Sequence, residues 1–507
     1  MTFEIVFVLL SLLGMMAALI ADKMRPGMVL FSVVVLFLCA GILTPKEMLE
    51  GFSNKGMITV ALLFLVSEGI RQSGTLGQVI KKLLPQGKTT VFKAQLRILP
   101  SVAFISAFLN NTPVVVIFAP IIKHWAKSVK LPATKFLIPL SYVTILGGIC
   151  TLIGTSTNLV VHGMILEAGY EGFTMFELGK VGIFIAIAGI IYLFIFSKRL
   201  LPDARPDTAV PDEEVEEGEK LHRVEAVLGA RFPGINKKLS DFNFQRHYGA
   251  EVKEIKTRNG QRYVDHLEDV VLREGDTLVV MADDTFIPTW GESSVFVLLT
   301  NGNDPDTSGK KKRWLALILL VLMIVGATVG ELPATKEMFP DIKLDMFFFV
   351  CITTIIMAWT NIFPARKYTK YISWDILITI ACAFAISKAM VNSGVADCVA
   401  GFIIGLSDDY GPHVLLAILF VITNLFTELI TNNAAAALAF PLALSISAQL
   451  GVSPTPFFVV ICMAASASFS TPIGYQTNLI VQGIGNYKFT DFVRIGLPLN
   501  IITFLIS

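Results

Sequence analysis

The sequence predicts an α-helical polytopic membrane protein made of two inverted repeats of five TM helices plus a re-entrant hairpin each, with a small α/β cytoplasmic domain inserted between them. Three observations support this fold class: an apolar composition, long apolar runs that recur along the chain, and an internal repeat. Of the 507 residues 54% are hydrophobic and 16% are charged, which leaves too little polar surface for a water-soluble protein of this size. The 41 lysines and arginines nearly balance the 40 acidic residues, so the composition does not indicate nucleic acid as a partner.

Apolar runs long enough to span a lipid bilayer recur from one end of the chain to the other. A hydrocarbon core requires about 20 helical residues, and slightly fewer where the ends are interfacial. Five runs are strong, at 5–21, 27–43, 181–197, 314–330 and 346–364. Five are weaker or interrupted, at 56–72, 136–163, 373–391, 457–486 and 494–507. The first run follows no basic segment and precedes no small-residue cleavage motif, so we interpret it as a retained helix.

A polar segment separates the two apolar halves. Eight acidic residues fall between positions 203 and 219, so we expect a solvated acidic linker over 201–219. The turn-rich sequence over 220–290 predicts the small α/β domain, with strands near 224–227, 251–255 and 277–281 and one short helix at 237–247. A second linker is expected over 291–312.

The distribution of basic residues predicts the orientation. With the N-terminus outside, the short inner segments carry seventeen lysines and arginines and the outer segments carry five, as the positive-inside rule requires. This orientation places residues 198–313 in the cytoplasm and both termini outside. The number of crossings agrees with this orientation only if the segments at about 95–128 and about 412–449 each enter and leave the membrane on the same side. These two segments are therefore candidate re-entrant hairpins.

Three blocks of the first half recur in the same order in the second half. The matches are 64–74 with 384–394 and 153–163 with 473–483, both offset by 320, and 110–112 with 431–433, offset by 321. An odd number of crossings in each half turns the halves upside down relative to each other. Inverted repeats of this kind are typical of secondary transporters, whose substrate site lies near the midplane where the repeats meet. We therefore expect membrane repeat 1 over 1–200 and membrane repeat 2 over 313–507.

Each expected hairpin has a polar tip, at 110–113 and 431–433, inside an apolar segment. Non-helical backbone at membrane depth is tolerated only within protein or against a water-filled cavity. Carbonyl and side-chain oxygens freed at such a tip suit a small hard cation, and the free N–H groups of the returning helix suit an anion. The spans 154–158 and 474–478 are expected to be unwound and to close the other side of each site. Ser106 and Thr427 lie one helical turn before the tips and are taken as further cation ligands.

At these residues the chain resembles the divalent anion:sodium symporter family, within the superfamily that includes arsenite and sodium–proton antiporters. That family carries a Ser-Asn-Thr triplet at each tip, where this chain has Asn110-Asn111-Thr112 and Thr431-Asn432-Asn433. Its Gly-Gly-x-x-Thr-x-x-Gly-Thr-x-x-Asn stretch is intact over 147–158. The resemblance implies Na⁺ as coupling ion, a small dianionic substrate, a homodimer in the lipid bilayer of a plasma or bacterial inner membrane, and an elevator-type movement of the hairpins.

Carried onto this sequence, the resemblance implies two sodium sites with the anion between them. Sodium site 1 is expected to comprise Ser106, Asn110, Asn111, Gly154 and Asn158. Sodium site 2 is expected to comprise Thr427, Thr431, Asn432, Gly474 and Asn478. The anion is expected against Asn111, Thr112, Thr155, Asn432, Asn433 and Tyr475.

The inserted segment resembles, over 272–280, the C-terminal regulatory domain of potassium-uptake and potassium-conductance regulators (TrkA-C, RCK-C). Anion permeases with such a domain between their halves resemble sulfate transporters, so sulfate is favoured as substrate, and a cytoplasmic ligand could bind the domain. The alternatives are a sodium/dicarboxylate symporter, a sodium–proton or arsenite antiporter with Glu428 as proton carrier, and, in another class, a regulated cation channel. The sequence has no P-loop or HExxH motif, so no enzymatic activity is predicted.

Overall fold

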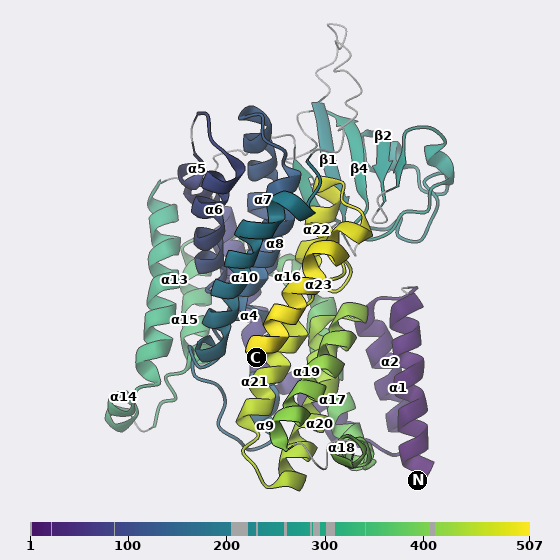
Figure 1. Cartoon of the computed structure of the whole chain (residues 1–507), viewed down its shortest axis with the longest axis vertical. Coiled ribbons are helices and arrows are strands. Elements are labelled where there is room, and N and C mark those ends of the chain that lie inside the picture. The colour runs from purple at the N-terminus through teal and green to yellow at the C-terminus, as the bar shows by residue number, and fades with distance from the viewer. Residues whose placement is uncertain are drawn as a thin grey trace, which may run out of the picture.

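A computed structural model describes residues 3–203, 222–300 and 310–507, with gaps at 22, 86, 230–231, 258–260, 284–285, 287–289, 291–294, 340 and 406–410. In the order of the chain a β-sheet stands between two groups of helices. In space the sheet lies at one end of the molecule, and helices of the two groups pack against one another (Figure 1).

The first group of helices precedes the sheet in the chain. Its members are α1 (Phe3–Ala21), α2 (Pro26–Cys39), α3 (Pro45–Glu50), α4 (Lys55–Gln72), α5 (Thr75–Leu83), α6 (Val91–Ser106), α7 (Asn111–Ser128), α8 (Thr134–Gly148), α9 (Ser156–Glu167) and α10 (Gly179–Leu200). Helices α6 and α7, joined by a short turn, cover the segment expected as the first hairpin.

The second group follows the sheet. Its members are α13 (Lys310–Gly330), α14 (Pro333–Met338), α15 (Met346–Trp359), α16 (Tyr368–Tyr371), α17 (Trp374–Asn392), α18 (Val395–Gly405), α19 (Pro412–Leu429), α20 (Asn432–Leu450), α21 (Thr455–Ser466), α22 (Gln476–Gly485) and α23 (Phe489–Ile506). Helices α19 and α20 cover the segment expected as the second hairpin.

Eight helical segments in the described part of the chain are long and apolar enough to cross a membrane. They are Phe3–Ala21, Pro45–Gln72, Gly179–Leu200, Lys311–Gly330, Trp374–Asn392, Pro412–Leu429, Asn432–Leu450 and Phe489–Ile506. Large apolar side chains such as Leu10, Phe184 and Leu505 are exposed on the outside of the bundle, as lipid contact requires. The prediction of a multi-pass helical membrane protein is therefore confirmed.

Two of the ten expected crossings are broken near their middle. The run 136–163 divides into α8 and α9, and the run 457–486 divides into α21 and α22. Glycines allow the first break to pack closely: a Cβ on Gly147 would collide with the carbonyl of Ala103 on α6, and one on Gly154 would collide with the carbonyl of Gly148. The breaks leave backbone groups at 149–155 and 467–475 that a continuous helix would have paired internally. Residues 156–158 and 476–478, expected to be unwound, are already the first turns of α9 and α22.

The five-stranded sheet consists of β1 (His222–Leu228), β2 (Glu251–Lys256), β3 (Arg262–Tyr263), β4 (Thr277–Ala282) and β5 (Phe296–Thr300). Its order is β3-β2-β4-β1-β5, and the paired strands are antiparallel. Strand β5 pairs with β1, so the sheet extends beyond the domain end expected at residue 290 and into the segment expected as a linker.

The helix expected over 237–247 is wrong for most of its length. The structure has only α11, Phe244–Tyr248. Residues 236–240 instead pair with residues 268–272, through hydrogen bonds such as Leu239 N to Val270 O at 3.0 Å. These backbone groups are satisfied across a loop and are no longer available to a helix.

The two faces of the sheet have different partners. Val224, Ala226 and the strand β4 residues Leu278 and Val280 belong to the core of the sheet domain itself. On the opposite face Val227 belongs to the core of the helical bundle. The alternation follows from the period of two along a strand, so the sheet buries one face in its own domain and the other against the helices.

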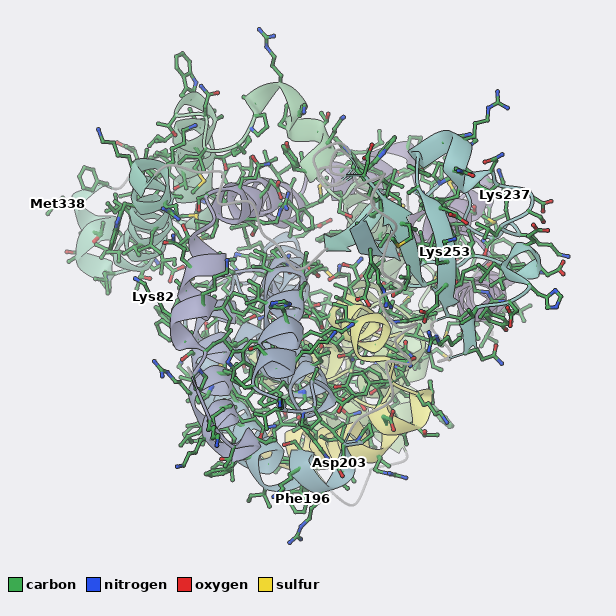
Figure 2. All side chains as sticks on the ribbon, turned by 90° about the horizontal axis from the view of Figure 1, so that it is seen from above. Lys82, Phe196, Asp203, Lys237, Lys253 and Met338 are labelled. Atoms are coloured by element: carbon green, nitrogen blue, oxygen red, sulfur yellow. The ribbon has the colours of Figure 1, made fainter. Side chains whose placement is uncertain are left out.

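The sheet lies at the end of the bundle that also holds α5, beside α22, whereas α14 and α18 lie at the opposite end (Figure 1). Seen from above in Figure 2, Lys237 and Lys253 lie on the sheet domain at one side of the molecule, and Met338 of α14 lies at the other. Basic residues of α5, Lys81 and Lys82, are thus at the same end as the sheet.

Candidate functional site

The first hairpin tip lies between the end of α6 at Ser106 and the start of α7 at Asn111. Ser106 and Asn111 are both completely buried, and Ser106 Oγ lies 2.8 Å from the amide of Asn111. Asn110 is the N-cap residue, but its side chain does not cap the helix. It lines a small cavity of about 10 Å³ together with Ser156 and residues of α4 and α13.

The second tip repeats this arrangement between α19 and α20. Thr427 Oγ1 donates to Asn432 Oδ1 at 2.8 Å, as Ser106 meets Asn111 in the first tip. Thr427 also lies 2.6 Å from the carbonyl of Ala465. Thr431 is the N-cap residue and its buried hydroxyl has no hydrogen-bond partner.

The two broken helices are held by one pattern of hydrogen bonds that occurs twice. Asn158 Nδ2 donates to the carbonyls of Gly148 and Thr151 at 3.4 and 2.9 Å. Asn478 Nδ2 donates to the carbonyls of Ser468 and Thr471 at 2.8 and 3.2 Å. Each Asn thus ties the start of one half-helix to the unwound segment before it. The partners in the second set follow those in the first at the 320-residue offset of the sequence repeat.

Each tip meets the broken helix of the other half of the chain. Asn111 of the first tip lies 2.5 Å from the hydroxyl of Tyr475, and Thr112 Oγ1 donates to Gln476 Oε1 at 3.3 Å. In the second tip, Asn433 Oδ1 accepts from the hydroxyls of Ser156 and Thr157 at 3.3 and 3.2 Å. Ser156 and Thr157 belong to the broken helix of the first half.

The hydroxyls of Thr155 and Tyr475, themselves related by the repeat, are 2.9 Å apart. The two halves are therefore interlocked at the site and not merely adjacent, because each tip is completed by residues of the opposite half.

The first set of candidate cation ligands provides uncharged oxygens. The amide of Asn111 faces Ser106 Oγ, the carbonyl of Gly154 and the carbonyl of Thr144. Asn158 Oδ1 is buried and has no hydrogen-bond partner. Among the described residues no group of three His, Cys, Asp or Glu side chains could hold a metal ion, so a cation here would be bound by neutral oxygens, which suits a monovalent hard ion better than a transition metal.

In the second set of candidate cation ligands, not every oxygen is free to face an ion. Asn432 and Thr427 are adjacent, and a Cβ on Gly474 would come within 2.5 Å of the carbonyl of Thr427. Asn478 Oδ1, however, accepts from Ser141 at 2.7 Å. Sequence reasoning did not find Ser141 or Thr144, because α8 shows no local sign of a site. Gln476 could have been found, since it lies within the repeated segment beside Tyr475.

Four helices begin at this site: α7 at Asn111, α9 at Ser156, α20 at Asn432 and α22 at Gln476. The first N–H groups of a helix have no partners within it and carry a partial positive charge. An anion can therefore be bound here without a lysine or arginine side chain.

Glu428 lies next to the second tip but takes part in a separate network. Its Oε1 accepts from the backbone N–H of Ser470 at 2.8 Å and from Asn500 Nδ2 at 2.7 Å. Asn500 also donates to Ser470 Oγ at 2.8 Å. The carboxylate is thus fixed between α19 and α23, and its Oε2 has no hydrogen-bond partner.

A multi-pass helical bundle with interrupted helices that meet at a buried polar site defines a membrane transporter. The model of the family described as "Citrate transporter" matches residues 16–451 and 338–507. The chain belongs to this family of transporters. The resemblance to sodium-coupled anion permeases drawn from the tip motifs is thereby confirmed at the level of the family, whereas the resemblance of the inserted domain stays a prediction.

Curated relatives include proteins similar to this chain along most of its length. An uncharacterized transporter of Synechocystis is 29% identical and the alignment covers 93% of this chain and 90% of that protein. An uncharacterized transporter of Escherichia coli is 26% identical over 98% of this chain and 97% of its own length. Sodium/sulfate cotransporter 2 of Chlamydomonas reinhardtii is 30% identical over 56% of this chain and 32% of its own length.

Proposed function

We propose that the protein is a sodium-coupled secondary active symporter that imports a small divalent anion, with sulfate favoured, by elevator-type alternating access. The observation that carries this proposal is the convergence of four helix N-termini and a set of uncharged oxygens from both halves of the chain on one buried site. Helix N-termini favour the anion, and carbonyl, amide and hydroxyl oxygens favour Na⁺. Sodium/sulfate cotransport is also the activity named for a relative.

We assign Na⁺ to two sites related by the repeat. Site 1 comprises Ser106, Asn111, Gly154 and Asn158, with the carbonyl of Thr144 as an additional ligand. Asn110 is a weaker ligand because it lines the cavity beside α4 and α13. Site 2 comprises Thr427, Thr431, Asn432, Gly474 and Asn478.

We place the anion between the tips, against Asn111, Thr112, Thr155, Asn432, Asn433 and Tyr475. Hydroxyl and amide groups from both halves of the chain meet here through direct hydrogen bonds. Dehydration of the anion would be offset by these donors and by the helix N-termini.

We propose that the membrane domain consists of two inverted repeats, over 1–200 and 313–507, each with a re-entrant hairpin. The hairpin α6–α7 has its base at the end of the bundle that carries the sheet, and α19–α20 has its base at the opposite end (Figure 1). The duplicated hydrogen bonds of Asn158 and Asn478 support the same relation.

We further propose that the sheet domain is cytoplasmic and regulatory and that both termini face outward. The basic residues of α5 lie at the same end as the sheet, as the positive-inside rule favours for the inner side. The domain boundaries are revised to 222–300, because β5 completes the sheet. A homodimer in the cell membrane and a cytoplasmic ligand on this domain remain part of the proposal.

A second candidate substrate is a carboxylate such as citrate or succinate, and the description of the family favours it. A sodium–proton or arsenite antiporter would use Glu428. The network with Ser470 and Asn500 holds this side chain apart from the tip asparagines, so we favour symport over antiport. A regulated channel would give flux that does not accumulate the anion against its gradient.

The test is uptake of radiolabelled sulfate into proteoliposomes with and without an inward sodium gradient, with sulfate, succinate, citrate and arsenite as competitors. Sodium-dependent, saturable, uphill uptake supports symport. If citrate or succinate inhibits at concentrations far below those at which unlabelled sulfate does, a carboxylate replaces sulfate as the proposed substrate. Asn111→Ala and Asn432→Ala should each abolish sodium-driven uptake. Asn392→Ala is the matched control, because Asn392 bonds to the carbonyl of Ile42 away from the site.

A further inference from the structure

The hydroxyl of Tyr475 lies where the candidate cation and anion sites meet. It is 2.5 Å from the amide of Asn111 and 2.9 Å from Thr155 Oγ1, and it also interacts with the side chain of Asn432. Thr155 is an anion ligand in the proposed function, and both asparagines are ligands of sodium as well as of the anion. A single hydroxyl, with one proton to donate, therefore touches ligands of both kinds.

The side-chain amide of Asn111 can fit its place in two orientations, which exchange Oδ1 and Nδ2 and give different hydrogen-bond partners. In the first, Oδ1 accepts from Ser106 Oγ at 2.8 Å and Nδ2 donates to the Tyr475 hydroxyl at 2.5 Å. In the second, Nδ2 donates to Ser106 Oγ at 2.8 Å, to the Thr144 carbonyl at 3.0 Å and to the Gly154 carbonyl at 3.2 Å, and Oδ1 accepts from the Tyr475 hydroxyl. Amide oxygen and nitrogen have nearly the same shape, so the hydrogen bonds decide between the two orientations. Without a cation they favour the second, because in the first Oδ1 faces the carbonyl oxygens of Thr144 and Gly154.

A cation selects the first orientation. The oxygens of Ser106, Thr144 and Gly154 surround one face of the Asn111 amide. A sodium ion bound among them is attracted by Oδ1 and repelled by the hydrogens of Nδ2. The second orientation replaces the cation by the amide hydrogens, which satisfy the same carbonyls.

An anion selects the first orientation too, through Tyr475. When Nδ2 of Asn111 donates to the hydroxyl, the proton of Tyr475 is free to point toward Thr155 and the anion. When Oδ1 of Asn111 faces the hydroxyl, that proton is used on Asn111, and only lone pairs remain to face the anion. Lone pairs repel an anion, whereas a hydroxyl proton binds it.

We propose that Tyr475 couples sodium binding to anion binding, because the hydrogen bond of its hydroxyl depends on the orientation of the Asn111 amide. Sodium at site 1 turns the amide so that Oδ1 faces the ion. The turned amide no longer accepts the Tyr475 hydroxyl proton, which is then free to bind the anion. Both ligands then stabilise one arrangement, so each raises the affinity for the other by the same factor. This inference rests on the proposed function, and it makes Tyr475 a coupling residue and not only part of the binding surface.

The contact between a phenol hydroxyl and a tip asparagine involves Tyr475 of the second repeat, and the reason lies in the residue that each repeat has at this position. The equivalent residue of the first repeat is Thr155, a shorter side chain whose hydroxyl lies against Tyr475. The phenol of Tyr475 meets Asn111, 364 residues away in sequence. Tyr475 is 8% exposed, so the interaction is protected from competing water.

The experiment is equilibrium binding of radiolabelled sulfate to the purified full-length protein, with and without saturating sodium, at constant ionic strength with choline. Sodium should raise the sulfate affinity of the unmodified protein by roughly tenfold to a hundredfold, within the usual range of coupling. Tyr475→Phe keeps the ring and removes the hydroxyl, so the sodium-induced gain should fall below about twofold. Tyr192→Phe is the matched control, because Tyr192 donates to the carbonyl of Ile495 away from the site, and it should keep the full gain.

A second variant separates coupling from a structural role. In Asn111→Leu the amide is absent and cannot take up the Tyr475 proton. The Tyr475 proton is then free for the anion with or without sodium, and sodium should give no gain in this variant. Without sodium, Tyr475→Phe should therefore weaken sulfate binding more when it is added to Asn111→Leu than when it is added to the unmodified protein. Equal effects of Tyr475→Phe in the two backgrounds would overturn the inference.

The inference is also overturned if Tyr475→Phe keeps the sodium-induced gain of the unmodified protein. Its failure differs from failure of the proposed function. If the unmodified protein shows no sodium-induced gain for sulfate, thiosulfate, succinate or citrate, the symport proposal itself is wrong. If it shows the gain and Tyr475→Phe retains it, only the role of Tyr475 is wrong.

Discussion

The ion pair between Lys123 and Glu225 joins the sheet domain to the hairpin α6–α7. Its removal should make the free energy with which the sheet domain docks on the helices less favourable. Lys123 lies on α7 about 18 Å from the tip residue Asn111, from the rise per residue of an α-helix. Its Nζ donates to both carboxylate oxygens of Glu225, at 3.1 and 3.0 Å. The two side chains are only 21% and 16% exposed, so solvent screens the pair less than it would a surface pair.

The surroundings of Glu225 set the expected magnitude. Burial alone would raise the pKa of this carboxyl, but Lys123 and then Lys256 lower it more, to about 2 from 4.5. Loss of hydrogen bonds to a charged group costs about 1.5 to 3 kcal/mol. We expect about 2 kcal/mol for Lys123→Met, because Lys256 remains 3.5 Å from the carboxylate and still neutralises it.

The assay is the rate at which a cysteine introduced at Val227 is modified, followed by mass spectrometry of the peptide that contains it. Val227 is 1% exposed and lies in the core of the helical bundle, so modification requires the sheet to detach. A weakening of about 2 kcal/mol should increase the rate about thirtyfold. The matched control is a cysteine at Ala226, which faces the core of the sheet domain and should not become more reactive.

The same pair predicts a pH dependence. The carboxyl of Glu225 has a lower pKa when docked than when free, so its contribution is complete above about pH 4.5 and is lost as the pH falls toward about 2. Because the thiolate is the reactive form of cysteine, the rate at position 227 is divided at each pH by the rate of the same cysteine in the unfolded protein. This ratio should be constant from pH 7 to pH 5 and rise below pH 4.5. An unchanged rate in Lys123→Met, or equal increases at 226 and 227, would refute the docking argument.

Three further predictions concern close packing and the role of the insert. Gly154→Ala should reduce uptake more than tenfold and lower thermal stability, because overpacking of a core costs about 1 to 3 kcal/mol and its Cβ would collide with the carbonyl of Gly148; normal uptake would contradict this. Gly483→Ala would place a Cβ 2.5 Å from Thr277 Oγ1, so it should accelerate modification at position 227, and a second change, Thr277→Ala, should reverse most of the effect if the contact is the cause. Replacement of residues 206–306 by a Gly/Ser linker should preserve sodium-coupled uptake but alter its maximal rate, and loss of substrate binding in the folded variant would show that the insert helps to build the site.

Much of the helical architecture and the identity of the tip residues followed from the sequence alone. Hydropathy and its interruptions are properties of short stretches of chain, so the spans and the two helix–turn–helix segments could be predicted. The interruptions were expected at 154–158 and 474–478, whereas the breaks in the structure lie at 149–155 and 467–475. The internal repeat then related Asn111 to Asn432 and Asn158 to Asn478 before any contact was known. Each of these asparagines has the same kind of partner in both halves.

Only the tertiary structure decided how the two halves meet. The contacts of Asn111 with Tyr475, and of Asn433 with Thr157, join residues far apart in the chain, and no local periodicity specifies which tip faces which broken helix. The same holds for β5 and for the segment expected as a helix at 237–247, whose backbone groups bond to residues 268–272 instead. Burial of one sheet face against α22 is likewise a property of packing, because Val227 and Ala226 have the same hydrophobic character in the sequence and differ only in which core they fill.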